Sequence, residues 1–144
     1  MEISTEENEN LLSTVFERVM EAVHANKDVS EQENCVYQVE QLSQEVNSGA
    51  SFEQYFRWVG KAELDQVVDY VKVLNIPEVV TLLEEAIEVA FPNGIPEDDD
   101  EYEACTEWTE SQEERLEGLF ELFEEYNGAI TNRLGVYIKE HDLA

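Results

Sequence analysis

The sequence predicts an all-α fold, a single compact domain of about seven to eight helices. Apolar residues recur every three to four positions along most of the chain, which is the spacing of one face of an α-helix. Proline, glycine and helix-capping patterns divide this periodicity into segments of helical length. With 144 residues, of which 42% are hydrophobic, the chain is large enough to bury one core. No segment fits the period-two pattern of a strand better than the helical pattern.

The first third of the chain is predicted to form two long helices. An apolar stripe through residues 11–23 marks the first helix, which is expected to end near Asn26. Ser30 and Glu33 have the spacing of a capping box and are expected to start the second helix. The apolar positions of that helix continue until Gly49 stops it.

The middle of the chain is predicted to form three helices. Ser51 and Gln54 repeat the capping-box spacing ahead of a short helix with core aromatic residues, namely Phe52, Tyr55, Phe56 and Trp58. A fourth helix is expected over residues 64–74, because the residue before a proline is pushed out of the helical region. Pro77 can start the fifth helix, which is expected to stop at the loop formed by residues 91–96.

The last third is predicted to form three more helices, all in the same domain. A short acidic helix is expected within residues 98–107, and Thr109 with Gln112 is expected to cap a longer one that reaches Tyr126. Apolar residues within 130–138 mark the last helix. The prediction is therefore one acidic helical domain over residues 1–144, with residues 1–8 left open as a flexible tail.

The chain is strongly acidic. It has 35 aspartates and glutamates against 8 lysines and arginines, a formal net charge of −27. This charge repels nucleic-acid phosphates and anionic lipids, so neither direct nucleic-acid binding nor membrane binding is expected. No apolar run approaches the ~20 residues of a membrane span, and residues 1–10 lack the regions of a signal peptide. We therefore expect a cytoplasmic protein.

The acidic residues are concentrated near the end of the chain. Between Glu97 and Glu125 there are fourteen acids and one base, Arg115. Projection of residues 110–126 at about 100° per residue gathers seven glutamates in an arc of roughly 120°. This carboxylate stripe consists of Glu110, Glu113, Glu114, Glu117, Glu121, Glu124 and Glu125. The opposite side of the projection carries the apolar residues Leu116, Leu119, Phe120, Leu122, Phe123 and Tyr126.

The carboxylate stripe carries like charges at i,i+4 spacing, and each such pair costs about 0.2–0.5 kcal/mol of helix stability. A helix selected for stability alone would alternate glutamate with lysine. Two interpretations stay open: a solvated face that keeps the protein soluble, or an electrostatic binding surface. Carboxylates about 5–6 Å apart approximate the phosphate spacing of a nucleic-acid strand. The second interpretation therefore predicts that the stripe occupies a cationic DNA-binding cleft.

No motif indicates catalysis, a cofactor or a metal. Glycine-rich phosphate loops, HExxH and nucleophile elbows are missing, and residues 98–101 lack the spacing of a calcium loop. Cys35 and Cys105 fall at core-like helical positions and are expected to be buried free thiols, while His24 and His141 are isolated. We therefore expect a protein that is not an enzyme and has no cofactor.

Two stretches of the chain resemble the nineteen-kilodalton DNA-mimic protein family of small acidic helical bacterial proteins. One is residues 45–56, a helix end, a glycine turn and an aromatic helix. The other is residues 90–96 with the acidic helices that follow, closing on residues 137–141. The chain departs from the family at Gly49-Ala50, where two glycines are usual, and at Arg57-Trp58-Val59, where an asparagine commonly follows the aromatic pair.

The resemblance implies a protein that imitates duplex DNA and blocks a DNA-binding protein, without a cofactor and as a homodimer. The partner that the resemblance implies is a repressor or a histone-like protein, and a restriction or CRISPR component stays open as a partner of the same basic kind. The acids expected to take the place of phosphates are Asp98, Asp99, Asp100, Glu101, Glu107, Glu110, Glu114, Glu117, Glu121 and Glu125. The alternative is an acidic helical adaptor or chaperone-like module whose contacts are mainly apolar and whose charge serves solubility.

Overall fold

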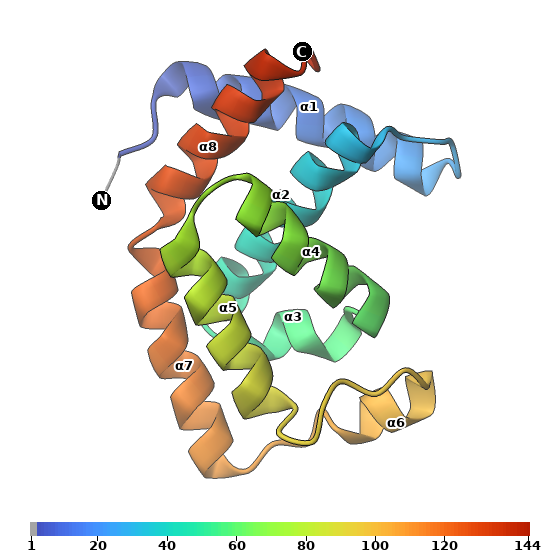
Figure 1. Cartoon of the computed structure of the whole chain (residues 1–144), viewed down its shortest axis with the longest axis vertical. Coiled ribbons are helices and arrows are strands. Elements are labelled where there is room, and N and C mark those ends of the chain that lie inside the picture. The colour runs from blue at the N-terminus through green and yellow to red at the C-terminus, as the bar shows by residue number, and fades with distance from the viewer. Residues whose placement is uncertain (1–2) are drawn as a thin grey trace.

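The computed structural model describes residues 3–144 and contains eight α-helices and no strand within that range (Figure 1). This confirms the predicted all-α fold. The helices are α1 (Glu6–His24), α2 (Glu31–Gly49), α3 (Glu53–Trp58), α4 (Lys61–Val73), α5 (Pro77–Ala90), α6 (Asp99–Ala104), α7 (Glu110–Glu124) and α8 (Asn127–Glu140). Residues 1 and 2 of the tail expected at the N-terminus lie outside the described residues, and α1 begins at Glu6.

The helices surround α2, which packs against α1, α3, α4, α7 and α8. Helices α4 and α5 form a hairpin in front of it, α7 runs beside α5, and α8 crosses α1 at one end of the molecule (Figure 1). Helix α6 lies apart at the opposite end (Figure 1). Both ends of the described chain lie near the α1–α8 crossing (Figure 1).

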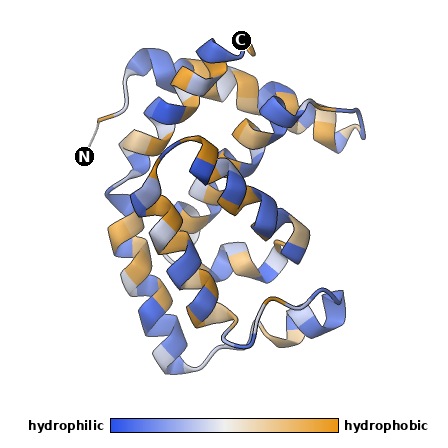
Figure 2. Ribbon diagram, in the orientation of Figure 1, coloured by the Kyte–Doolittle hydropathy of each residue, from blue (hydrophilic) through white to orange (hydrophobic). Residues whose placement is uncertain are grey.

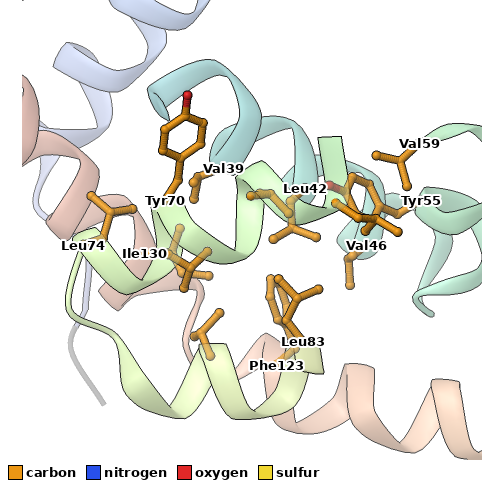
Figure 3. Close-up of a cluster of buried hydrophobic side chains, with 14 of the residues drawn as sticks. Val39, Leu42, Val46, Tyr55, Val59, Tyr70, Leu74, Leu83, Phe123 and Ile130 are labelled. Carbon is orange, nitrogen blue, oxygen red and sulfur yellow. The ribbon is translucent and has the colours of Figure 1, made fainter. Parts of the chain in front are cut away.

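One continuous core joins all eight helices. Hydrophobic and hydrophilic residues alternate along the helices (Figure 2), as expected of helices that bury one face. Leu42 of α2, Leu83 of α5 and Phe123 of α7 converge at its centre and are almost fully buried (Figure 3). Phe123 also meets Phe52 edge to face, with ring centroids 5.5 Å apart. The periodic apolar positions identified in the sequence therefore supply this buried core.

Three helix starts confirm the capping predictions. At α2, the Ser30 hydroxyl accepts from the backbone N–H of Glu33, and the Glu33 carboxylate accepts from that of Ser30. Thr109 and Gln112 make the same reciprocal bonds at α7. Pro77 occupies the first turn of α5, where its missing N–H has no partner to lose.

The capping box predicted from Ser51 and Gln54 is wrong. The Ser51 hydroxyl accepts from the backbone N–H of Glu53 at 3.3 Å, and the Gln54 amide donates to Glu45 of α2 at 2.6 Å. The N-cap position of α3 is held by Phe52, without a side-chain cap. Its ring is fully buried, so core packing rather than capping fixes the start of this helix.

The turn between α2 and α3 explains why the resembled family favours glycine there. Ala50, which stands where a second glycine is usual, adopts a left-handed conformation with φ 52° and ψ 31°. This conformation costs an L-residue with a Cβ atom roughly 1–2 kcal/mol, whereas it costs glycine almost nothing. The turn therefore keeps its left-handed geometry at Ala50, although alanine is less stable than glycine in this conformation.

Three side chains expected in the core are exposed instead. Trp58, the last residue of α3, is 46% exposed. Leu122 is 51% exposed because the buried face of α7 is narrower than the projection suggested. Cys105 is exposed because α6 ends at Ala104, which leaves this residue at the C-cap, whereas Cys35 is buried as predicted.

Helices α1 and α8 pack closely through Gly135. A Cβ atom at this position would collide with the side chain of Asn8. The Asn8 side-chain amide donates to Oδ1 of the Asn132 side chain at 3.0 Å, and the same oxygen accepts from the backbone N–H of Thr5 at 2.9 Å. Lys139 pairs with Glu7 at 3.0 Å on the surface of the same contact. We call this contact the α1–α8 seam.

Candidate functional site

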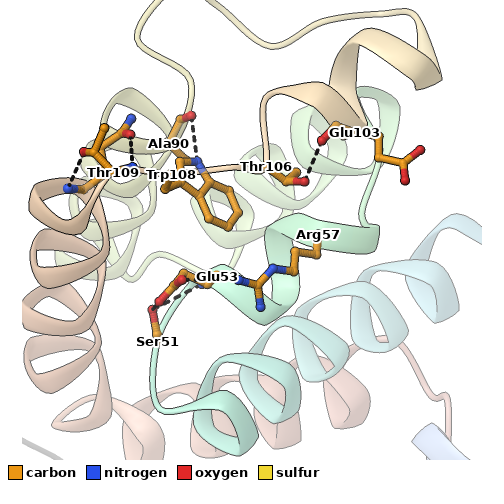
Figure 4. Close-up of polar contacts among 9 residues, drawn as sticks. Ser51, Glu53, Arg57, Ala90, Glu103, Thr106, Trp108 and Thr109 are labelled. Atoms are coloured by element: carbon orange, nitrogen blue, oxygen red, sulfur yellow. Dashed lines mark hydrogen bonds and ion pairs between the residues drawn. The ribbon is translucent and has the colours of Figure 1, made fainter.

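Helix α7 carries the carboxylate stripe and is fixed to the body of the protein at its first turn. The Gln112 side chain donates to the Val89 carbonyl at 2.9 Å. The Trp108 indole donates to the Ala90 carbonyl at 3.0 Å (Figure 4). The Arg57 guanidinium lies 5.6 Å from the Trp108 ring centroid. Two carbonyls at the end of α5 thereby orient the segment that leads into α7.

The inner face of α7 buries Leu116, Leu119 and Phe123, while Phe120 is half-buried. The outer face carries the stripe, as predicted. Six of its seven glutamates are exposed, and Glu113 is the half-buried exception. Those six span about 22 Å at a rise of 1.5 Å per residue. The helix therefore has one apolar face that fixes it and one acidic face available to solvent.

Glu113 lies near Glu53 of α3, and its carboxyl group acts on the pKa of Glu53. The Glu53 side chain is only 12% exposed. Burial raises the pKa of Glu53 above its ordinary 4.5, and the neighbouring carboxyl group of Glu113 raises it further, against the lowering effect of Ser51 and Arg57. Glu113 thus contributes to the α3–α7 contact, in addition to its place in the stripe.

Cations do little to neutralise the acidic surface. Five ion pairs occur within residues 3–144, and none uses any of the ten acids predicted as phosphate-mimicking residues. Arg115, the one base of the acidic region, pairs with Glu85 of α5 at 2.8 Å. The charge of the stripe is therefore not balanced locally.

Helix α6 presents three of the predicted acids, Asp99, Asp100 and Glu101, and a fourth, Asp98, lies immediately before it. The Asp98 carboxylate accepts from the backbone N–H groups of Asp100 and Glu101 at 2.8 and 3.4 Å, so this residue is also the N-cap. All of these acids are exposed. Of the six residues of α6, Tyr102 alone is buried, with its ring 5.1 Å from that of Phe91.

The Tyr102 hydroxyl is buried near that of Tyr55, and neither makes a hydrogen bond to any described residue. Burial raises the pKa of both phenols. The charge of Glu63 adds to the effect at each of them. Tyr102 is thus a neutral apolar anchor for α6 under ordinary conditions.

The structure places all ten predicted acids on the surface, in two groups. Glu110, Glu114, Glu117, Glu121 and Glu125 follow the outer face of α7, whereas Asp98, Asp99, Asp100 and Glu101 lie at the start of α6. Glu107 lies between the groups, in the segment that joins the two helices. The segment separates α6 from the stripe (Figure 1), so the sequence grouped acids that belong to two patches.

Sequence reasoning missed the contact of Glu53 with Glu113 and that of Arg57 with Trp108. Both join α3 to residues more than fifty positions away, and no local pattern encodes such pairing. The one signal in the sequence for these contacts of α3 was the departure from the resembled family at Arg57-Trp58-Val59. Here Arg57 has a defined position beside Trp108 and pairs with Glu53 at 3.4 Å.

Other kinds of site find little support in the described residues. Within residues 3–144, no three histidine, cysteine, aspartate or glutamate side chains are placed to hold one metal ion. Over the same range, no helix has both the length and the apolar character required to cross a membrane. The fold and the surface together define an acidic all-helical protein with an extended, unbalanced row of carboxylates.

The comparison with protein families is consistent with that description. The family described as DMP19-like protein matches residues 27–141. The chain belongs to this family, which is the DNA-mimic family that the sequence resembles. No curated protein and no solved structure matches the chain.

Proposed function

We propose that this protein imitates duplex DNA and competitively blocks a basic DNA-binding protein. The observation that carries the proposal is the outer face of α7, where six exposed glutamates follow one another without a cation partner among the described residues. Membership of the DMP19-like family supports it at the family level. The protein acts by occupying a binding surface, so the proposal includes no catalytic step.

The physical basis is charge and spacing. The carboxylates take the place of phosphates in a cationic cleft, and association releases counterions as DNA binding does. The helix accepts several like-charged i,i+4 pairs, which a solubilising surface could avoid by alternating glutamate with lysine. We regard the stripe on α7 as the main contact and the acids of α6 as a second patch on the same partner.

The partner in this proposal is a repressor, a nucleoid protein, or a restriction or CRISPR component, met in the cytoplasm. The homodimer implied by the resemblance remains a prediction. Capture from host lysate on the immobilised protein at low salt, followed by elution with duplex DNA, identifies the partner. The expected result is a basic protein that duplex DNA elutes and that an uncharged polymer does not.

A charge-removing variant tests which surface is used. The E114Q/E117Q/E121Q protein is expected to bind the captured partner at least about tenfold more weakly at low salt. The matched control is E17Q/E21Q/E140Q, which removes the same charge from exposed positions on α1 and α8. Equal weakening by both variants would show that only net charge matters, and unchanged binding by both would support the apolar adaptor instead.

A further inference from the structure

A second acidic site lies outside the carboxylate stripe, in an open groove between α4 and α5. The groove encloses about 680 Å³, which is within the roughly 300–1,000 Å³ of ligand pockets. Its lining residues are Asp65, Val68, Asp69, Glu84, Ile87, Glu88 and Ile95. None of the acids predicted to imitate phosphates belongs to this set.

The two walls of the groove repeat one pattern. Helix α4 supplies Asp65-x-x-Val68-Asp69, and α5 supplies Glu84-x-x-Ile87-Glu88. In each helix, two acids at i,i+4 spacing flank a β-branched apolar residue on the same face. Helices α4 and α5 form a hairpin (Figure 1). Both copies of the pattern line the same groove.

The floor of the groove is apolar and its rim is negative. Val68, Ile87 and Ile95 are half-buried and pack against the core, so each leaves part of its apolar surface in the groove. The four acids are largely solvent-facing. Lys61 pairs with Asp65 at 3.0 Å, while Asp69, Glu84 and Glu88 take part in no ion pair within residues 3–144.

We infer that this groove binds a protein segment that presents an arginine or lysine beside an apolar side chain. The apolar side chain would lie on Val68 and Ile87, and the cationic group would be held by the carboxylates of both helices. Charge complementarity selects this occupant, since no basic side chain of the chain lines the groove. A polyanion such as DNA would be repelled.

The site differs from the stripe on α7 in the kind of binding that it supports. Binding to the stripe is almost purely electrostatic and weakens steeply with salt, because exposed charges are screened. Burial of an apolar side chain is not screened in this way. The groove therefore gives a basic partner a salt-resistant contact, and it does so whether or not the stripe imitates DNA.

Two short peptides of equal charge provide the probe. One alternates leucine with arginine, and the other alternates glycine with arginine. Calorimetry at about 0.1 M and about 0.5 M NaCl measures their affinity for the full-length protein. We expect the leucine peptide to bind about tenfold more tightly and to keep this advantage at high salt. NMR shift changes with the unmodified protein should be centred on α4 and α5.

Variants then assign the advantage to the groove. Ile87→Gln should remove the difference between the two peptides, and D69N/E88Q should weaken both peptides. The control E17Q/E21Q removes the same charge from another exposed i,i+4 pair, on α1, and should leave the leucine advantage intact, as should E114Q/E117Q/E121Q. Equal affinity of the two peptides, or shift changes centred on α7, would overturn the inference and leave the proposed DNA mimicry untouched.

Discussion

The α1–α8 seam and the acidic surface of α6 and α7 differ in whether a basic side chain pairs with their acids. At the seam, Glu7 pairs with Lys139, and a glycine lets the two helices approach closely. On α7, six glutamates face solvent, and the one nearby base, Arg115, pairs with α5 instead. The seam is organised for packing. The acidic surface keeps unbalanced charge on a helix that is held by its inner face and by its first turn.

The attachment of α6 should be the most sensitive point of the acidic surface, because Tyr102 is its only buried side chain. Tyr102→Ala is expected to lower the free energy of unfolding by about 3 kcal/mol, the cost of deleting a large buried aromatic side chain. Hydrogen exchange should show the backbone of residues 99–104 losing its protection first. Circular dichroism and chemical denaturation measure the loss.

Tyr102→Phe is the control for that experiment. Because the Tyr102 hydroxyl is buried without a hydrogen-bond partner among the described residues, its removal should leave stability unchanged or raise it by up to about 1 kcal/mol. A destabilised Phe variant would show that the hydroxyl has a role that the structure does not explain. Equal protection of residues 99–104 in the Ala variant would show that α6 has other anchors.

Two glycines compare the seam with α7 directly. Gly135→Ala should destabilise the protein by about 2 kcal/mol, since the new methyl group collides with Asn8 across the seam. Gly118→Ala on α7 meets no atom within 4 Å and should stabilise the helix by about 0.5–1 kcal/mol. Thermal unfolding of the two variants measures both signs. Effects of the same sign would contradict the contrast between a close seam and an open face.

The pair formed by Glu53 and Glu113 should make part of the stability of the α3–α7 contact depend on pH. Because the pKa of Glu53 is raised in the folded protein, the folded state holds its proton more tightly than the unfolded state. The contribution of Glu53 to stability is therefore fully present below the ordinary value of 4.5 and is lost as pH rises through the raised pKa.

Glu113→Gln tests that pair, because the amide can donate to the Glu53 carboxylate. The variant should be more stable than the parent by about 1 kcal/mol at about pH 7 and equal to it at about pH 4. Denaturation at both pH values measures the difference. A gain of the same size at both would place its origin in helix propensity rather than in the carboxyl pair.

Local signals predicted the fold well, while contacts between distant segments escaped them. The stop at Gly49, the start at Pro77 and the box at Thr109 depend on neighbouring residues, and all three are confirmed. The exposure of Trp58 and Leu122 depends on how far other helices cover α3 and α7, which spacing alone does not show.

The same division applies to the candidate site. The outer face of α7 followed from helical projection, because all of its acids lie within one helix. Helical projection did not predict that Glu113 is half-buried, because its neighbour Glu53 lies on another helix. The separation of the α6 acids from the stripe depends on the path of residues 105–109, for which the sequence has no periodic signal.

The salt dependence of partner binding tests most directly whether the stripe on α7 serves binding at the expense of stability. The E114Q/E117Q/E121Q variant removes all four i,i+4 glutamate pairs of the stripe, so its unfolding free energy should rise by about 1–2 kcal/mol. Its plot of log Kd against log salt concentration should be shallower than that of the unmodified protein, because fewer counterions are released. A variant that gains this stability yet keeps the affinity and salt slope of the unmodified protein would contradict the account.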